Sequence, residues 1–321
     1  MQRLIIDGGS AGGRLDKYLM KYLNRAPKSF VYKMLRKKNI KLNGKKAAGS
    51  EILQAGDELC LYLADDTVAQ FRADMRIKAQ HTAPDIVYED ENIIAARKPA
   101  GMLVQGDKNE DAENLNDILL CYLDEKGGLD GIFKPGIANR LDRNTGGLVL
   151  MGKNLAAAQA LAEALRENKA DKTYIAAVCG RVDESGGISG WHTKDDKNRV
   201  LITREKRAGA SPVKTLYTPL FTGERYSILS VKLITGKSHQ IRESLLVAGH
   251  PIIGDPKYGD PKENAFFRQK FGLTHQLLYA VSFELRDMRG ILEYLNGKKI
   301  ECSPDKRAQK ILEHIKKSAQ D

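Results

Sequence analysis

Four short segments combine residue types that could carry acid–base or nucleophilic chemistry. They are Gly136–Leu148, Lys172–Tyr174, Thr235–Arg242 and Gly249–Gly259, and Arg97–Met102 precedes them. The first segment contains Asp142, whose carboxylate could act as a nucleophile when ionised. The second offers the phenol of Tyr174. The third offers the guanidinium of Arg242, which can orient a carboxylate through paired hydrogen bonds.

Taken one at a time, these residues have ordinary structural interpretations. An aspartate before a turn such as Asn144–Gly147 is typical of turns and caps. His239 is interpreted as a structural hydrogen-bonding residue, because no metal-ligand spacing surrounds it. Gly and Pro dominate Gly249–Gly259, so this segment and its Asp255 are interpreted as a conformation-setting loop. Only the joint occurrence of the segments favours a catalytic site.

In this order and spacing the segments resemble the RluA-type pseudouridine synthase family, over about residues 84–290. The resemblance implies an enzyme that isomerises uridine in RNA with an ionised carboxylate beside a flipped nucleotide, without a cofactor or a metal. It implies Asp142 as that carboxylate, Arg242 as its partner and Tyr174 as the tyrosine that faces the base. The chemical route stays open: the carboxylate could add to the base, attack the anomeric carbon or remove a ribose proton.

Arg140 lies two residues before Asp142, so both side chains would point the same way in extended backbone. It could contact a phosphate or occupy the space that the flipped base vacates. The family pattern is not matched everywhere. Asn139 replaces its usual His, Gly146 its usual Ser and Ser244 its common His, and Trp191–Asp195 replaces a loop that usually contains Pro-Ile. We interpret these departures as marks of a subgroup.

The elements that must position these residues follow from the local patterns. Strands are predicted at 85–89, 92–97, 172–180, 200–203, 226–234 and 278–285, and helices at 114–122 and 155–168. Strands and helices mix without strict alternation. We therefore expect an α+β catalytic domain with a mixed, mostly antiparallel sheet.

The first 63 residues have a different character. They hold 13 Lys and Arg against 5 Asp and Glu, so most of the chain's net charge of +11 lies there. Helical spacing is present in 13–23, and Ser29 could cap a second, basic helix. Asn43-Gly44 predicts a tight turn, and Gly56-Asp57 predicts another before a strand at 58–63.

This order of two helices and a hairpin resembles the S4-type RNA-binding domain. The resemblance, together with the charge, implies contacts with structured RNA. The candidate RNA-binding residues are Arg14, Lys17, Lys33, Arg36, Lys37 and Lys38. A small basic helical hairpin without a particular ligand is the alternative.

We thus expect an S4-type domain at 1–63, a linker at 64–83, a catalytic domain at 84–301 and a basic helical tail at 302–321. In the tail, 305–317 is predicted to be a helix surrounded by solvent.

No apolar run reaches the roughly 20 residues of a membrane helix. The first ten residues are too short and too acidic for a signal peptide. The four cysteines form no CxxC motif. These patterns favour a cytoplasmic protein, and we expect a monomer.

Large-subunit ribosomal RNA is the expected substrate, because family members with this amino-terminal module often modify it. Two alternatives remain. The first is a non-catalytic RNA-binding or ribosome-assembly protein that retains the fold, which Asn139 and Ser244 motivate. The second is a glycosidase-like enzyme, which would need a second carboxylate such as Asp255.

Overall fold

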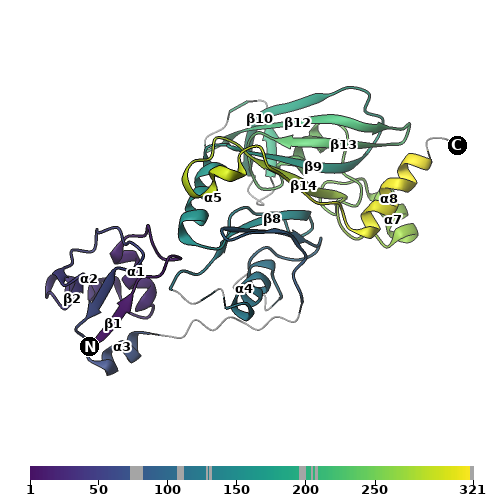
Figure 1. Cartoon of the computed structure of the whole chain (residues 1–321). Coiled ribbons are helices and arrows are strands. Elements are labelled where there is room, and N and C mark those ends of the chain that lie inside the picture. The colour runs from purple at the N-terminus through teal and green to yellow at the C-terminus, as the bar shows by residue number, and fades with distance from the viewer. Residues whose placement is uncertain are drawn as a thin grey trace.

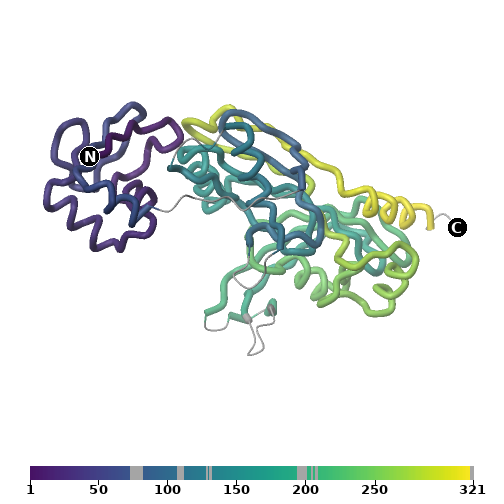
Figure 2. Tube along the Cα trace, turned by 90° about the horizontal axis from the view of Figure 1, so that it is seen from below, coloured from purple at the N-terminus to yellow at the C-terminus, as the bar shows by residue number. Residues whose placement is uncertain are grey.

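The computed structural model describes residues 1–72, 82–106, 112–127, 129, 132–194, 200–203, 205–206 and 209–318. Figures 1 and 2 show a small amino-terminal domain at one end of an elongated molecule, with the chain termini at opposite ends. The domains meet near residue 155, where the Leu155 N–H donates to the Gly9 carbonyl at 3.0 Å. Ile132 also packs against the core of the amino-terminal domain.

The amino-terminal domain combines helices with a four-stranded antiparallel sheet. The helices are α1 (Leu15–Tyr22), α2 (Lys28–Arg36) and α3 (Asp65–Phe71), and the sheet order is β1 (Gln2–Ile5), β4 (Glu58–Leu61), β2 (Ile40–Leu42) and β3 (Lys45–Lys46). Between β2 and β3, Asn43 and Gly44 both have positive φ, at 48° and 75°. This confirms the predicted two-residue hairpin turn.

The ends of α2 differ from the prediction. Ser29 is not its cap, because Pro27 occupies the N-cap position and the helix begins at Lys28. Proline lacks the backbone N–H that would have no intrahelical partner at a helix start. At the other end Lys38 takes a φ of 62°, and the Asn39 N–H donates to Met34 O.

Helix α3 lies in the segment that the sequence assigns to a linker. Its Val68 is 2% exposed and belongs to the buried cluster of the amino-terminal domain. The packed part of that domain therefore extends past Leu63 into α3.

The larger domain, which follows the amino-terminal domain in the chain, is built on one large sheet. Its main path runs β11 (Val200–Thr203), β10 (Gly186–Lys194), β12 (Ser211–Thr222), β13 (Tyr226–Leu233), β9 (Ala170–Cys179), β14 (Leu278–Leu285), β8 (Gly146–Gly152), β6 (Ile93–Lys98) and β5 (Ile86–Glu89); β15 (Lys299–Glu301) pairs with β14 and β7 (Gly136–Ile137) with β8. Among the described strands only β14 and β8 pair in parallel. The predicted mixed, mostly antiparallel sheet is confirmed.

Helices cover both faces of this sheet. They are α4 (Leu115–Glu125), α5 (Leu155–Arg166), α6 (Gln240–Val247), α7 (Pro261–Phe271), α8 (Lys306–Lys317) and the 3-10 helix η1 (Gly290–Leu295). Along β6, Ile94 packs in the cluster that contains α4 and α6, whereas Ile93 packs with α5 and η1. Burial on both faces follows from the alternation of side chains along a strand.

Two predictions for this domain are wrong. Trp191 to Lys194 do not form a loop but the end of β10, paired with β11; Asp195 lies outside the described residues. Helix α8 does not stand in solvent, because Ile311 and Ile315 are 0% and 1% exposed and share a buried cluster with Phe267 of α7. Their spacing on one face allows this packing although most other positions of the helix are polar.

The packing of α8 can be tested by truncating one side chain. Replacing Ile311 with alanine is expected to destabilise the protein by about 2–5 kcal/mol, the usual cost of deleting a buried aliphatic side chain. Lys310→Ala, on the exposed side of the same helix, should change stability by less than about 0.5 kcal/mol. Urea unfolding measures both. Equal, small effects would mean that α8 does not pack as described.

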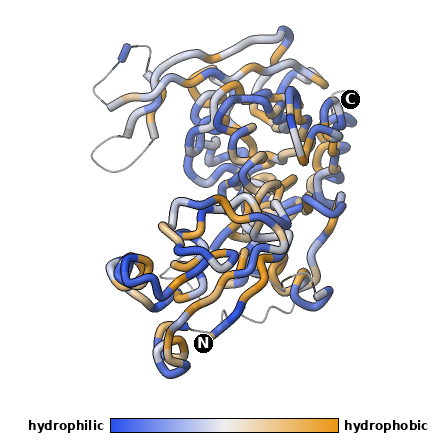
Figure 3. Tube along the Cα trace, turned by 60° about the vertical axis from the view of Figure 1, so that its left-hand side comes forward, coloured by the Kyte–Doolittle hydropathy of each residue, from blue (hydrophilic) through white to orange (hydrophobic). Residues whose placement is uncertain are grey.

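Figure 3 shows hydrophobic and hydrophilic residues interspersed along most elements. Within the described part of the chain, no helix combines the length and apolar character needed to cross a membrane.

Candidate active site

The three predicted catalytic residues come together from separate elements. Asp142 lies in the loop between β7 and β8, Tyr174 on β9 and Arg242 in the first turn of α6. All three line a cavity of about 660 Å³, as does the exposed Arg140. The catalytic-domain residues that the sequence singled out therefore share one site.

Arg242 holds two carboxylates at once. Its Nη1 donates to Asp142 Oδ2 at 3.0 Å, while Nε and Nη2 donate to the two oxygens of Asp255 at 2.6 and 2.9 Å. Burial disfavours the charged guanidinium, but Asp255 and then Asp142 outweigh it, so the pKa of Arg242 is raised. The paired bonds to Asp255 hold the guanidinium plane and direct Nη1 at Asp142.

Asp255 is the anchor of this arrangement. Its side chain is 0% exposed and also accepts the backbone N–H groups of Lys257 and Tyr258 at 2.9 and 3.0 Å. Burial alone would raise its pKa, yet the hydrogen bonds and charge of Arg242 lower it below the usual range. The predicted structural nature of Asp255 is thus borne out, but its contact with Arg242 was not foreseen.

The loop that carries Asp142 is held from several sides. The Asn139 amide donates to the Leu148 carbonyl at 3.2 Å and accepts from the Leu150 N–H at 2.8 Å. Thr145 N–H closes a turn on the Asp142 carbonyl at 3.0 Å. Asn139, where the family usually has His, therefore has both a donor and an acceptor partner and ties the loop to β8.

Lys98 is a buried residue that stabilises the same loop through hydrogen bonds to backbone carbonyl groups. It is 0% exposed, and its ammonium donates to the carbonyls of Pro99, Met102 and Arg143 at 3.0, 2.7 and 2.8 Å. Burial lowers the pKa of Lys98 to about 7, although the charge of Asp142 opposes this. The bond to the Arg143 carbonyl fixes the backbone directly after Asp142.

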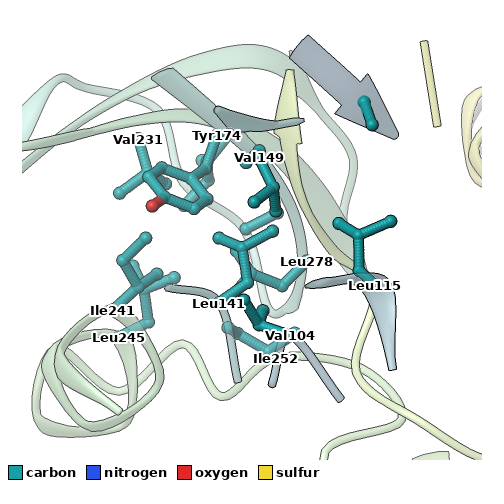
Figure 4. Close-up of a cluster of buried hydrophobic side chains, with 14 of the residues drawn as sticks. Val104, Leu115, Leu141, Val149, Tyr174, Val231, Ile241, Leu245, Ile252 and Leu278 are labelled. Carbon is teal, nitrogen blue, oxygen red and sulfur yellow. The ribbon is translucent and has the colours of Figure 1, made fainter. Parts of the chain in front are cut away.

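Tyr174 forms the apolar wall of the cavity. Its side chain is 6% exposed and lies in the buried cluster with Val231, Leu141 and Ile241 (Figure 4). Burial, and secondarily the charge of Asp142, raises the pKa of this phenol. Tyr174 is therefore a protonated, rigidly packed ring beside Asp142.

His239 also belongs to the site, although the sequence analysis interpreted it only as a structural residue. Its Nε2 lies 3.9 Å from Asp142 Oδ2, and its Nδ1 lies 3.1 Å from the Tyr258 hydroxyl. Burial lowers the pKa of His239, against the attraction of Asp142. The predicted hydrogen bond is present, and the position of His239 shortly before Arg242 was the signal that could have placed it near the carboxylate.

Two other departures from the family pattern have local explanations. Ser244 is fully buried, with its hydroxyl 3.0 Å from that of Thr215. At Gly146, a Cβ would lie 2.5 and 2.7 Å from ring atoms of Tyr279, so the ring occupies the space of a side chain. The Tyr279 hydroxyl donates to Asp305, the N-cap residue of α8, at 2.6 Å.

Gly146 therefore offers a second test. Gly146→Ala is expected to destabilise the protein by about 1–3 kcal/mol, because the new methyl group would overlap a buried ring. Gly136→Ala is the control, since nothing lies within 4 Å of its Cβ position. Urea unfolding compares the two. A Gly146 variant as stable as the Gly136 variant would contradict the close approach of Tyr279.

The candidate RNA-binding residues of the amino-terminal domain lie apart from this cavity. Arg14, Lys17, Lys33, Arg36, Lys37 and Lys38 are all exposed. Arg14 is also paired with Asp16, with Nη2 2.9 Å from Oδ2, and the Tyr32 hydroxyl donates to the same carboxylate at 3.0 Å. Asp16 thus links the start of α1 to α2. Across the described chain, no group of three His, Cys, Asp or Glu residues is placed to hold a metal ion.

Comparison with known proteins identifies the family. Residues 92–246 match the family model for RNA pseudouridylate synthase. The chain is 31% identical over 268 residues to ribosomal large subunit pseudouridine synthase C of Rickettsia bellii, covering 80% of this chain and 86% of that protein. It is also 31% identical over 255 residues to ribosomal large subunit pseudouridine synthase D of Neisseria meningitidis, of which it spans 65%, with 78% of this chain covered.

Among solved structures, human RNA pseudouridylate synthase domain containing 4 shares the fold. The TM-score is 0.56 at 21% identity, with 71% of this chain and 93% of that chain covered. The resemblance seen in the sequence motifs is thereby confirmed. The chain belongs to the RluA-type family of RNA pseudouridine synthases.

Proposed function

We propose that this protein converts specific uridines of large-subunit ribosomal RNA to pseudouridine, with Asp142 as its catalytic carboxylate and without a cofactor. The observation that carries the proposal is the 3.0 Å contact between Arg242 and Asp142 inside a cavity walled by Tyr174. The ribosomal substrate is suggested by the names of the relatives from Rickettsia bellii and Neisseria meningitidis.

The reaction needs no net reagent. The bond from ribose C1′ to uracil N1 breaks, the ring turns, and a bond from C1′ to C5 forms. C5 then loses a proton and N1 carries one, so atoms and electrons balance within the nucleotide. An ionised carboxylate can add to the base, attack C1′ or remove a ribose proton. In each case the hydrogen bond from Arg242 Nη1 would orient the Asp142 carboxylate.

Tyr174 and Arg140 would serve the flipped nucleotide. The buried ring of Tyr174 is suited to stacking on uracil, and its protonated hydroxyl could assist a late proton transfer. Arg140 is exposed at the rim of the same cavity, where it could contact a phosphate or fill the vacated stack.

We also propose that the amino-terminal domain is an S4-type RNA-binding domain that holds structured RNA through phosphates and shape. Its six exposed basic residues support this assignment. We propose a catalytic domain that begins near residue 84 and extends past residue 301, because Ile311 and Ile315 of α8 pack against α7. We expect the enzyme to act as a monomer in the cytoplasm.

Pseudouridine mapping of ribosomal and transfer RNA tests the proposal. Wild-type cells, a deletion strain and the deletion complemented with Asp142→Ala should be compared. One or a few large-subunit sites should vanish on deletion and stay absent with the variant. If no site changes and the purified protein binds RNA without making product, the protein is an RNA-binding member that retains the fold.

A further inference from the structure

Lys172 is a cavity residue to which the proposed chemistry gives no task. It lies on β9 two residues before Tyr174, so both side chains leave the same face of the sheet. Both line the cavity that contains Asp142. The Lys172 ammonium reaches the loop before α6, where it lies 3.7 Å from the position that a Cβ on Gly236 would take.

The ammonium of Lys172 is partly buried without an opposite charge. No carboxylate oxygen of the described residues lies within 4.0 Å of Lys172 Nζ, the distance limit for an ion pair. None of the described residues forms a hydrogen bond with this ammonium group. Lys98 differs, because three backbone carbonyls accept from its ammonium. Burial lowers the pKa of Lys172. A charge withdrawn from water in this way costs free energy unless an anion compensates it.

We propose that Lys172 binds a backbone phosphate of the nucleotide whose base enters the cavity beside Tyr174. The inference rests on the proposed function, because RNA is the substrate that brings an anion to this position. Residues two apart on a strand emerge about 7 Å apart. Tyr174 and Lys172 can therefore contact the base and the backbone of one nucleotide. The contact reads no sequence and positions the uridine against Asp142.

The chain supplies a matched control on the neighbouring strand. Lys232 of β13 is exposed and pairs with Thr173, whereas Val231 pairs with Tyr174. Lys232 therefore lies on the sheet face opposite to Lys172 and Tyr174. Replacing either lysine removes the same charge from the protein, but only Lys172 faces the cavity.

The experiment compares wild type, Lys172→Met, Lys172→Arg and Lys232→Met on large-subunit ribosomal RNA purified from a deletion strain. Affinity is measured over a salt series, and product formation is measured in the same preparations. Lys172→Met should raise KM and Kd about tenfold. It should also reduce the magnitude of the slope of log affinity against log salt concentration by about 0.7–0.9, which is the contribution of one phosphate contact. Its kcat should stay within about twofold. Lys172→Arg and Lys232→Met should keep the wild-type slope.

An unchanged salt slope in Lys172→Met, or a loss of kcat at constant KM, would overturn the inference while leaving the proposed function intact. If wild type makes no product, the proposed function fails, and the salt slopes still decide whether Lys172 binds phosphate. Thermal unfolding checks that the variants are folded. Should the methionine variant not fold, Lys172→Gln replaces it as the neutral variant.

Discussion

Asp142→Asn is expected to reduce pseudouridine formation by roughly 10³-fold or more while RNA affinity stays within about threefold of wild type. The amide keeps the size of the side chain, and the turn at Thr145 depends on the Asp142 backbone carbonyl. What disappears is the negative charge that can act as nucleophile or base. The measurement is single-turnover product formation on RNA from the deletion strain, with RNA binding measured in parallel.

Asp124→Asn is a matched control, because this aspartate is exposed on the far part of α4 and does not line the cavity. It should leave both rate and affinity unchanged. An Asp142→Asn enzyme that keeps more than about a tenth of wild-type activity would remove Asp142 from the catalytic role, since general-base contributions alone usually exceed that factor.

Asp255→Ala is expected to destabilise the protein by about 3–5 kcal/mol, because it leaves the buried guanidinium of Arg242 without its main partner. Product formation should also fall, since Nε and Nη2 of Arg242 lose the contacts that direct Nη1 at Asp142. Asp255→Asn keeps the shape but not the charge and should lie between alanine and wild type. Urea unfolding and single-turnover rates are the readouts.

The same pair predicts a pH dependence of stability. The pKa of Asp255 is lowered in the folded state from 3.8, so its ionised form stabilises the fold above that pH. This contribution is lost as the pH falls from about 4 through the lower folded-state pKa. Wild type should therefore lose more stability than Asp255→Asn between pH 5 and pH 3. Parallel acid profiles of the two proteins would show that Asp255 does not carry this charge interaction.

Local sequence patterns were sufficient where neighbouring residues decide the structure. The Asn43-Gly44 turn follows from the ease with which both residues take positive φ. The helices α4 and α5 and the strands β6, β9 and β14 follow from apolar spacing within each segment. The four motif segments, in their order and spacing, likewise indicated the family, since the residues of each segment are contiguous in the chain.

Helix α6 and the burial of helix α8 could not be predicted in this way. Helix α6 is short and buries the polar Gln240, Arg242 and Glu243, so it shows no apolar stripe in the sequence. Helix α8 looked polar because its apolar residues are few, and its burial depends on α7 supplying the other half of the cluster.

The sequence by itself determined the family, the α+β class and the identity of Asp142, Tyr174 and Arg242 as candidates. Only the tertiary structure decided that Asp255 holds Arg242, that His239 lies beside Asp142 and that Lys172 shares their cavity. The physical reason is distance along the chain. Asp142 and Arg242 are 100 residues apart, and a contact between them exists only after β8, β9 and α6 have packed against one another.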